Sequence, residues 1–440
     1  MKRFLALAIA ALMIFSCAAC SSDGNGDTTA AEGTTAADTV SDVIAAPAND
    51  DTTAPSETAA PAENGGNTAS PSPAPADRNN NINIIIKPAG TAKPSAGGSS
   101  TVTPPKTDNT PVEVETDPKK IIVSAEKEWI FTEKITDSCH ASTVLPLDDG
   151  SVIAAWFGGS SEKENDVNIY TSVRTEKDGW SKPIVVSAAA EIAHWNPVLF
   201  QKEDGTVILY FKVGKDTDYW QTYYATSTDG RSWSTPKELV PGDNSGGRGP
   251  VKNKPIRLKN GTVLAPASTE IDGKWKAFVD ISTDDGKTWS KTSVIDSSFL
   301  GFFKVPMIQP TLWESKDGSV HMLTRTKLGK IYRSDSLDGG KTWCRAYATK
   351  LPNNNSGIDL DTDDSGRIFL AYNPVGIPGI RTPLVLSVST DDGKTFTKIK
   401  TFERGLAEYS YPAVVVKGDT IHITYTYERD YIAYWQIKIK

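Results

Sequence analysis

The amino-acid sequence predicts an all-β fold over residues 121–440, a six-bladed β-propeller of four-stranded antiparallel blades. Three observations support this prediction. A phrase made of a turn and an apolar strand occurs six times, a second turn motif recurs in phase with it, and helical periodicity is absent. Short strands separated by turn signals, with a period of about 50 residues, are typical of propeller blades.

Residues 1–20 are expected to be a secretory signal, because two basic residues precede an apolar run that is too short to span a bilayer. The segment ends in Ala-Ala-Cys and resembles a bacterial lipoprotein signal, in which the cysteine is lipidated and becomes the new N-terminus. Cys20 is the predicted lipidation site, and Cys17 is the second candidate. We therefore expect an exported protein that a lipid anchors to the bacterial cell surface. The alternative is a secreted protein with an ordinary cleaved signal.

Residues 21–120 consist mainly of Ala, Thr, Ser, Pro, Gly, Asn and Asp, with few large apolar side chains. Such a segment cannot bury enough apolar surface to offset the entropy lost on ordering. We predict a disordered linker that holds the folded domain, residues 121–440, away from the membrane.

The first repeat is a turn glycine followed by an apolar strand, as in DGSVIAAWFG. Its six glycines are Gly150, Gly205, Gly261, Gly318, Gly366 and Gly418. One such repeat cannot bury both faces of its sheet by itself. The copies must therefore stack on one another in a ring.

The second repeat is a Ser-Thr-Asp-Asp-Gly-Lys-Thr-Trp type turn, present at 227–233, 282–289, 336–343 and 389–396. The aspartate accepts hydrogen bonds from turn amides, the glycine permits a positive φ, and the aromatic residue packs between strands. This motif is the Asp-box, or BNR repeat, of the sialidase superfamily. We expect Asp284, Asp338 and Asp391 to stabilise turns, so the boxes indicate the fold and not the activity.

The whole predicted domain resembles bacterial exo-sialidases (neuraminidases). That family holds a substrate carboxylate with three arginines, and it uses a tyrosine nucleophile helped by a glutamate and an aspartate as acid/base. By resemblance, Arg325 and Arg381 are the middle and last arginines, and Arg381 runs directly into an Asp-box. Tyr409, in EYSYPAV, matches the nucleophile segment. Asp166, in the loop after WFGG, matches the acid/base position.

Two positions depart from the family pattern. His140, in CHASTVL, stands where the family has its first arginine, and Gln309 stands where it has the glutamate. Glu408 is placed among the substrate-binding residues, but adjacent strand residues face opposite sides, so it cannot simply activate Tyr409. Two arginines still favour a carboxylate. The expected substrate is therefore an altered sialic acid, a related keto-acid sugar or a uronic acid.

Other polar and aromatic residues near the predicted inner strands are Trp195, Asn196, Lys212, Lys252, Lys254, Glu270, Asn373 and Tyr411. Trp195 is either a platform for a sugar ring or a core residue between blades, and with Asn196 it is a candidate for substrate binding. Lys252 and Lys254 are two residues apart and can face one side of a strand. There they either add positive potential to the pocket or lie at its solvated rim.

Composition and motifs exclude several function classes. The formal net charge is −7 and no basic run occurs, which argues against nucleic-acid binding. The chain has no HExxH, no CxxC pair and no carboxylates at ligand spacing, so no metal or other cofactor is predicted. Cys139 and Cys344 either pair with each other or are both free thiols.

Three functions remain open, and an enzyme is favoured. In a retaining sialidase-type glycoside hydrolase, Tyr409 attacks the anomeric carbon, Asp166 protonates the leaving oxygen and then activates water, and Arg325 and Arg381 hold the carboxylate. In a lyase acting on a uronic-acid polysaccharide, His140 and Tyr409 transfer protons while arginine neutralises the carboxylate. The third possibility is a non-catalytic propeller that binds glycans at the cell surface.

Overall fold

The computed structural model describes residues 115–188 and 191–440. The predicted signal, the lipidation candidates Cys17 and Cys20, and the predicted linker up to residue 114 lie outside these residues.

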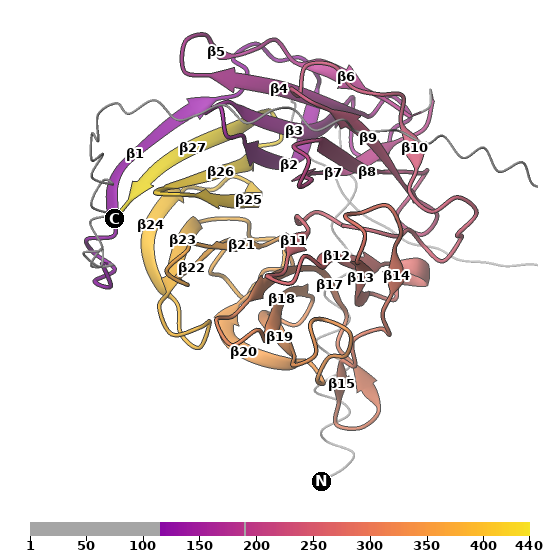
Figure 1. Ribbon diagram of the computed structural model, residues 1–440, viewed down its shortest axis with the longest axis vertical. Helices are drawn as coiled ribbons and strands as arrows, with labels where there is room; N and C mark the ends of the chain where they lie inside the picture. Colours follow the sequence, from indigo (N-terminus) through magenta and orange to yellow (C-terminus); the bar gives the residue numbers. More distant parts are fainter. Residues whose placement is uncertain (1–114, 189–190) are drawn as a thin grey trace, which may run out of the picture. The chain divides into compact units, whose positions relative to one another are not determined.

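Six antiparallel sheets follow one another around a ring (Figure 1), which confirms the predicted six-bladed β-propeller. The innermost strands are β2 (Ser138–Pro146), β7 (His194–Gln201), β11 (Ile256–Arg257), β17 (Met307–Glu314), β21 (Asp359–Thr362) and β25 (Tyr409–Lys417). The second strands are β3 (Val152–Gly159), β8 (Val207–Val213), β12 (Val263–Thr269), β18 (Val320–Thr326), β22 (Ile368–Tyr372) and β26 (Thr420–Tyr427).

The outer half of each blade contains a third and a fourth strand. The third strands are β4 (Asn168–Thr175), β9 (Gln221–Ser227), β13 (Lys276–Ser282), β19 (Lys330–Ser336), β23 (Leu384–Ser389) and β27 (Tyr431–Ile439). The outermost strands are β5 (Gly179–Trp180), β10 (Lys237–Glu238), β14 (Ser290–Lys291), β20 (Tyr347–Pro352), β24 (Thr397–Glu403) and β1 (Ile122–Trp129). We number the blades 1 to 6 by the order of their innermost strands. A short strand, β6 (Ile184–Val186), pairs with β4, and β15 (Ser298–Phe299) and β16 (Phe303–Lys304) form a separate hairpin.

The ring is closed by strands from the two ends of the domain. Strand β1 pairs antiparallel with β27, for example Glu126 with Gln436, so the N-terminal strand completes the blade that the C-terminal strands build. This pairing protects the edge of β27 and holds blade 6 beside blade 1.

The second strands are buried on both faces. Every residue of β3, β8, β12, β18 and β22 is buried, because a neighbouring blade covers each face of the sheet. Trp156 of β3, for example, lies in one hydrophobic cluster with Ala413 and Tyr434 of blade 6. This two-sided burial explains why these strands read as nearly continuous apolar runs in the sequence.

The six repeat glycines occupy the turns between the first and second strands. Each has a φ in the left-handed region, from 56° at Gly418 to 87° at Gly366. A side chain would be strained there, which is why the repeated phrase carries glycine at this point.

The Asp-box aspartates stabilise turns between the third and fourth strands, as their motif predicts. Asp391 accepts hydrogen bonds from the Thr395 amide at 2.8 Å, from the Thr395 hydroxyl at 2.6 Å and from the Ser389 hydroxyl at 2.8 Å. Asp284 and Asp338 make the same contacts in their blades.

A β-bulge interrupts the innermost strand in at least four blades. The register shifts between His140 and Thr143, and shifts at the same place in β7, β17 and β25. At this place Ala141, Asn196, Gln309 and Tyr411 have positive φ values between 43° and 53°, and Lys252 has a φ of 71° just before β11. Bulges turn a side chain out of the regular alternation of a strand, which matters for the site described below.

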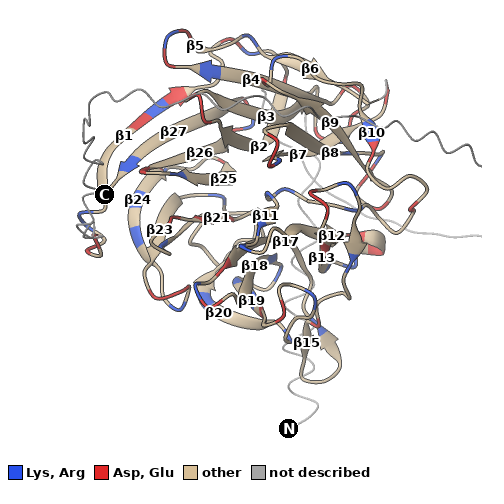
Figure 2. Cartoon of the chain, viewed as in Figure 1, with Lys and Arg blue, Asp and Glu red and all other residues tan. Residues whose placement is uncertain are grey.

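Cys139 is buried in β2 and Cys344 is exposed after β19, and both are free thiols. Figure 2 shows acidic and basic residues interspersed over the ring, while most of the strand surface carries neither. Within residues 115–188 and 191–440, no helix is long and apolar enough to cross a membrane. The same residues contain no group of three or more His, Cys, Asp or Glu side chains that could hold a metal ion.

Candidate active site

One end of the ring carries the arginines that the sequence singles out. Neighbouring strands in an antiparallel blade run in opposite directions, so the start of each first strand and the connection between its second and third strands lie at the same end. We call this end the loop face. The repeat glycines and the Asp-boxes lie at the opposite end, the turn face.

Arg325, on β18, organises the buried part of the loop face. Its Nη1 donates to the Tyr411 hydroxyl oxygen at 2.5 Å and to Gln309 Oε1 at 3.1 Å, while its Nε donates to Asn355 Oδ1 at 3.2 Å. Arg325 is 7% exposed and Tyr411 8%, so these bonds form away from bulk water. Trp275 packs against the guanidinium, and the Arg325 Cζ atom lies 5.0 Å from the centre of the Trp275 ring.

His140 lies against the Tyr411 ring, with the two ring centres 4.2 Å apart. The imidazole is almost completely buried, and its Nδ1 has no hydrogen-bond partner among the described residues. The closest carboxylate oxygen is Glu408 Oε1, at 3.9 Å from Nδ1. Burial, followed by the charges of Arg429, Arg381 and Arg325, lowers the pKa of His140 well below its usual value, so the ring is neutral at neutral pH.

Two further arginines meet a carboxylate above this buried layer. Glu408 Oε1 accepts from Arg381 Nη1 at 2.5 Å, and Glu408 Oε2 accepts from Arg429 Nε at 3.2 Å. Arg429 also binds Glu162 at 2.7 Å, and Arg381 lies 5.5 Å from the centre of the Tyr411 ring. Burial alone would raise the pKa of Glu408, but the charges of Arg381 and Arg429 outweigh it and lower the pKa, so Glu408 is ionised.

The structure therefore brings together five of the residues that the sequence singles out for catalysis or substrate binding: His140, Gln309, Arg325, Arg381 and Glu408. Their cluster combines guanidinium groups, a phenol and a neutral imidazole. This combination can bind an anion, transfer a proton and offer a nucleophilic oxygen.

Tyr409 lies outside this cluster. Its hydroxyl donates to Glu428 Oε1 at 3.4 Å and its ring packs on Tyr427, with ring centres 5.0 Å apart. Burial is the main cause that raises the pKa of Tyr409 to about 12. The tyrosine in the cluster is therefore Tyr411 and not Tyr409. The bulge in β25 explains this, because it turns the Tyr411 side chain toward Arg325.

Asp166 also has its polar contacts elsewhere. Its carboxylate accepts from the Ser160 amide and from the Ser160 hydroxyl, both at 2.9 Å. It closes the loop between β3 and β4 and lines shallow hollows with Lys134 and Tyr170. Glu162, in the same loop, is the carboxylate that binds Arg429 of the cluster.

The remaining candidates have structural contacts. Trp195 is 2% exposed and its Nε1 donates to the Gly214 carbonyl, so its ring lies in the core. Lys252 Nζ donates to the carbonyls of Ile358, at 2.9 Å, and Pro412, and burial lowers its pKa to about 7. Asn196 is buried at the bulge of β7.

Lys254, Lys212 and Asn373 also connect strands. Lys254 Nζ donates to the Leu360 and Val414 carbonyls at 2.7 and 2.6 Å. Lys212 Nζ donates to the Arg248 carbonyl at 2.8 Å, and Asn373 Nδ2 donates to the Pro383 and Tyr409 carbonyls at 2.9 Å. These contacts hold inner strands and loops in place.

Five residues of the site were not expected from the sequence, namely Arg429, Glu162, Trp275, Asn355, and Lys327, whose ammonium lies 4.0 Å from the centre of the Trp275 ring. All but Asn355 belong to connections between second and third strands, whose polar residues resemble those of any exposed turn. A signal for Tyr411 did exist, because proline follows each of Asn196, Gln309 and Tyr411. Proline has no N–H for the ladder and is tolerated at bulges, so this repeated pair marks the residue that leaves the regular alternation.

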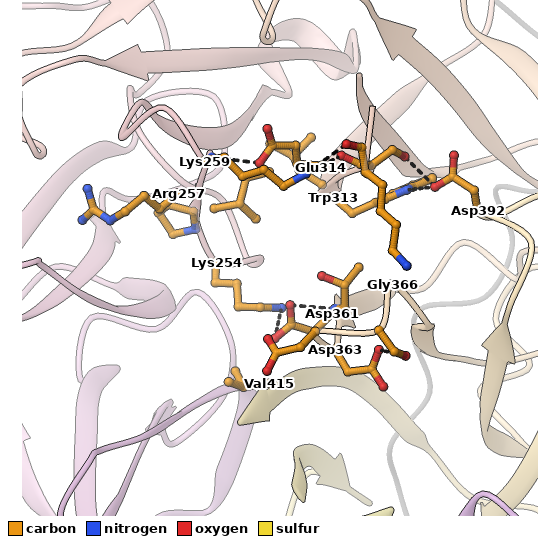
Figure 3. A pocket seen from close by; sticks show the side chains of 18 of the residues that line it. Lys254, Arg257, Lys259, Trp313, Glu314, Asp361, Asp363, Gly366, Asp392 and Val415 are labelled. Atoms are coloured by element: carbon orange, nitrogen blue, oxygen red, sulfur yellow. Dashed lines mark hydrogen bonds and ion pairs between the residues drawn. The ribbon is translucent and has the colours of Figure 1, made fainter. Parts of the chain in front are cut away.

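A cavity of about 900 Å³ lies at the turn face and not at the site. It is lined by the far ends of the inner strands, including Val415, and by charged turns (Figure 3). Lys254 lies 4.0 Å from Asp361 in this cavity, and Trp313 donates to Asp392 at 3.2 Å. Other charged side chains of its lining bind partners outside it, since Arg257 pairs with Asp285 at 2.5 Å and Asp363 with Arg367 at 2.7 Å.

Comparison with known proteins places this geometry in a family. A family profile described as "BNR repeat-like domain" matches residues 150–423. No curated protein matches the sequence with significance.

Solved structures with the same fold include a protein of unknown function from Dyadobacter fermentans, 17% identical with a TM-score of 0.60, aligned over 72% of this chain and 100% of that one. A Hadza microbial sialidase is 16% identical, with a TM-score of 0.59 over 69% of this chain and 66% of that chain. Trypanosoma rangeli sialidase in complex with the inhibitor DANA is 14% identical, with a TM-score of 0.57 over 72% and 60%. At these identities the likeness shows the fold.

Proposed function

The chain belongs to the family of BNR repeat-like domains, and from this premise we propose that it is a glycoside hydrolase that removes a terminal acidic sugar from a glycan. The observation that carries the proposal is the Tyr411 hydroxyl, hydrogen-bonded to Arg325 and covered by Arg381. A phenol held between two guanidinium groups suits a substrate that carries a carboxylate next to the reacting carbon.

The candidate nucleophile is Tyr411 in place of Tyr409. A carboxylate nucleophile would be repelled by the charge of an acidic sugar, whereas a neutral phenol is not. Tyrosine is a weak nucleophile near its ordinary pKa of about 10. Arg325 offsets this weakness, because its donated hydrogen bond stabilises the developing negative charge on the phenol oxygen.

His140 is the candidate acceptor for the Tyr411 proton. A guanidinium group and the Gln309 amide are not basic, whereas the neutral imidazole packs on the Tyr411 ring and its Nδ1 has no hydrogen-bond partner among the described residues. The three nearby arginines suppress the basicity of His140. A bound substrate carboxylate would offset their charge and make His140 more basic when substrate is present.

Substrate binding is expected to exchange ion pairs. Glu408 now occupies the guanidinium groups of Arg381 and Arg429. An incoming carboxylate would take part of that place, while Glu162 continues to hold Arg429. In the ensuing step the Tyr411 oxygen attacks the anomeric carbon, the glycosidic C–O bond breaks, and water later releases the sugar from Tyr411.

The test is turnover of a fluorogenic sialoside by the full-length chain and by two matched variants. Tyr411→Phe is expected to lower kcat/KM by roughly a thousandfold or more, since it removes the nucleophilic oxygen. Tyr409→Phe, two residues away, is expected to retain activity. The assignment fails if Tyr409→Phe is the inactive variant.

A second candidate is a lyase that acts on uronic-acid polysaccharides. Gln309 favours it, because within residues 115–188 and 191–440 no carboxylate is hydrogen-bonded to the Tyr411 hydroxyl, and so does the neutral His140 beside that tyrosine. A lyase would leave an unsaturated sugar that absorbs in the ultraviolet, whereas a hydrolase releases a reducing sugar without this absorbance.

We further propose that the protein is exported and lipid-anchored through Cys20, from the resemblance of residues 1–20 to a lipoprotein signal. Labelling with radioactive palmitate in a bacterial host tests this. The label should be lost in Cys20→Ala and kept in Cys17→Ala. The reverse pattern would move the anchor to Cys17, and no label in the wild type would favour a secreted protein.

A further inference from the structure

We propose that Glu270 donates the proton to the departing oxygen of the substrate, a role that rests on the proposed glycoside hydrolysis. The loop aspartate Asp166 is hydrogen-bonded within its own turn. Its polar contacts are thus to Ser160 and not to the cluster around Arg325, which leaves the role of proton donor open to another carboxyl of the loop face.

The hairpin of β12 and β13 directs Glu270 toward the Arg325 cluster. Ser268, two residues before Glu270, accepts a hydrogen bond from the Gln309 amide at 3.2 Å, so this side of β12 faces the innermost strand of blade 4. Residues two apart in an extended segment share a side. Glu270 directly follows β12 and therefore continues along the side that faces Gln309.

Trp275 gives the same direction independently. Thr269 and Lys276 are the last paired residues of the hairpin, and Glu270 and Trp275 come directly after and before them. Residues in these positions continue the alternation of the ladder and point to the same side. The Trp275 ring lies 5.0 Å from the Arg325 guanidinium and 4.0 Å from the Lys327 ammonium. Glu270 is thus the carboxyl on the blade 3 side of the cluster.

Glu270 differs from Glu408 and Glu162, the two carboxylates that bind the arginines of the cluster, in having no hydrogen bond or ion pair within the described residues. Glu408 and Glu162 are each bound to an arginine, and the charges of Arg381 and Arg429 lower the pKa of Glu408, which makes it a poor proton donor. Among the described residues, no hydrogen bond or ion pair reaches the Glu270 carboxyl, although Glu270 precedes a 3₁₀ turn (η2, Ile271–Gly273) that it could have capped.

The electrostatic surroundings favour the protonated form of Glu270. Burial raises its pKa, the positive charges of Arg325 and Lys327 oppose this in part, and the negative charges of Glu162 and Asp218 add to it, with a net upward shift. A carboxylic acid with a raised pKa is suited to general acid catalysis near neutral pH.

The proton count closes around this residue. As Tyr411 bonds to the anomeric carbon and gives its proton to His140, the departing glycosidic oxygen takes a proton from Glu270. The Glu270 carboxylate then removes a proton from the water that attacks the sugar–Tyr411 bond. His140 returns its proton to the Tyr411 oxygen, and all groups regain their starting state.

The test compares two sialosides that differ only in the leaving group. A 4-nitrophenyl sialoside leaves without proton assistance, whereas an alkyl sialoside needs it. Glu270→Gln is expected to lower kcat/KM for the alkyl substrate by about 10²–10⁴-fold and to change the nitrophenyl substrate by less than about tenfold. The alkaline limb of the pH profile should also disappear in this variant.

Two matched variants complete the design, with unchanged melting temperature as the control for folding. Asp166→Asn is expected to treat the two substrates alike, and Glu162→Gln is expected to raise KM for both. The inference is overturned if Glu270→Gln affects both substrates equally, or if Asp166→Asn shows the selective loss. A wild-type chain that turns over neither sialoside would instead refute the proposed function, and with it the role of Glu270.

Discussion

Replacing Arg325 with methionine is expected to remove most of the activity while changing stability little. The substitution preserves much of the aliphatic volume and deletes the guanidinium. The lost hydrogen bond to the Tyr411 oxygen is charge-assisted and contributes about 1.5–3 kcal/mol. A lost contact to the substrate carboxylate contributes about as much. Together these terms are about 3–6 kcal/mol, which corresponds to a fall in kcat/KM of about 10²–10⁴-fold.

The stability change from this substitution has two opposing parts. Gln309 and Asn355 lose their shared donor, at a cost of roughly 1 kcal/mol each. The variant no longer buries a cation near other cations, and this relief offsets the cost. The melting temperature should therefore stay within about 3 °C of the wild-type value.

Arg333→Met is the matched control, because Arg333 also lies in blade 4 and over a tryptophan ring, at 4.9 Å from Trp313. Arg333 binds Asp335 at 2.7 Å and contacts His321, away from Tyr411. Breaking this partly buried pair costs roughly 3 kcal/mol, or a melting temperature lower by about 4 °C, with activity unchanged. Calorimetry measures the stability of both variants, and sialoside kinetics measure their activity. Equal losses of activity in the two variants would refute the assignment of Arg325.

Three further predictions concern stability and reactivity. Lys252 has a pKa lowered to about 7, so the unfolded chain holds more protons above that pH. The unfolding free energy of the wild type minus that of Lys252→Met should therefore rise by about 1 kcal/mol between pH 7 and pH 8, as measured by denaturant titration. A difference that falls over this pH range would contradict the prediction. Asp391→Ala removes three turn hydrogen bonds and should lower the free energy of unfolding by about 1–2 kcal/mol without affecting kcat. An unchanged melting temperature would show that this Asp-box is dispensable for stability. A thiol reagent should label the exposed Cys344 rapidly in the native chain. It should label Cys139 only after unfolding, because Cys139 is buried and burial raises the pKa of its thiol to about 12. If neither of these two cysteines is labelled without a reductant, they form a disulfide.

Much of the architecture was predictable because its signals are local and repeated. A glycine with positive φ is required wherever a tight turn joins the first two strands, so all six copies keep it. The Asp-box aspartates use only contacts within their own turns. The grouping of His140, Gln309, Arg325 and Arg381 was expected only from the resemblance to sialidases, since these residues lie on first strands, on a second strand and in a connecting loop.

The sequence by itself thus determined a ring of six blades and the end of that ring at which arginines meet. Only the tertiary structure decided which tyrosine joins them, because two residues of β25 oppose one residue of β26 at the bulge and Tyr411 leaves the alternation that Tyr409 follows. It also decided that Arg429 and Glu162 meet, since they lie in different blades 267 residues apart in the chain. Their contact depends on the closure of the ring by β1 and β27, which no local pattern around either residue encodes.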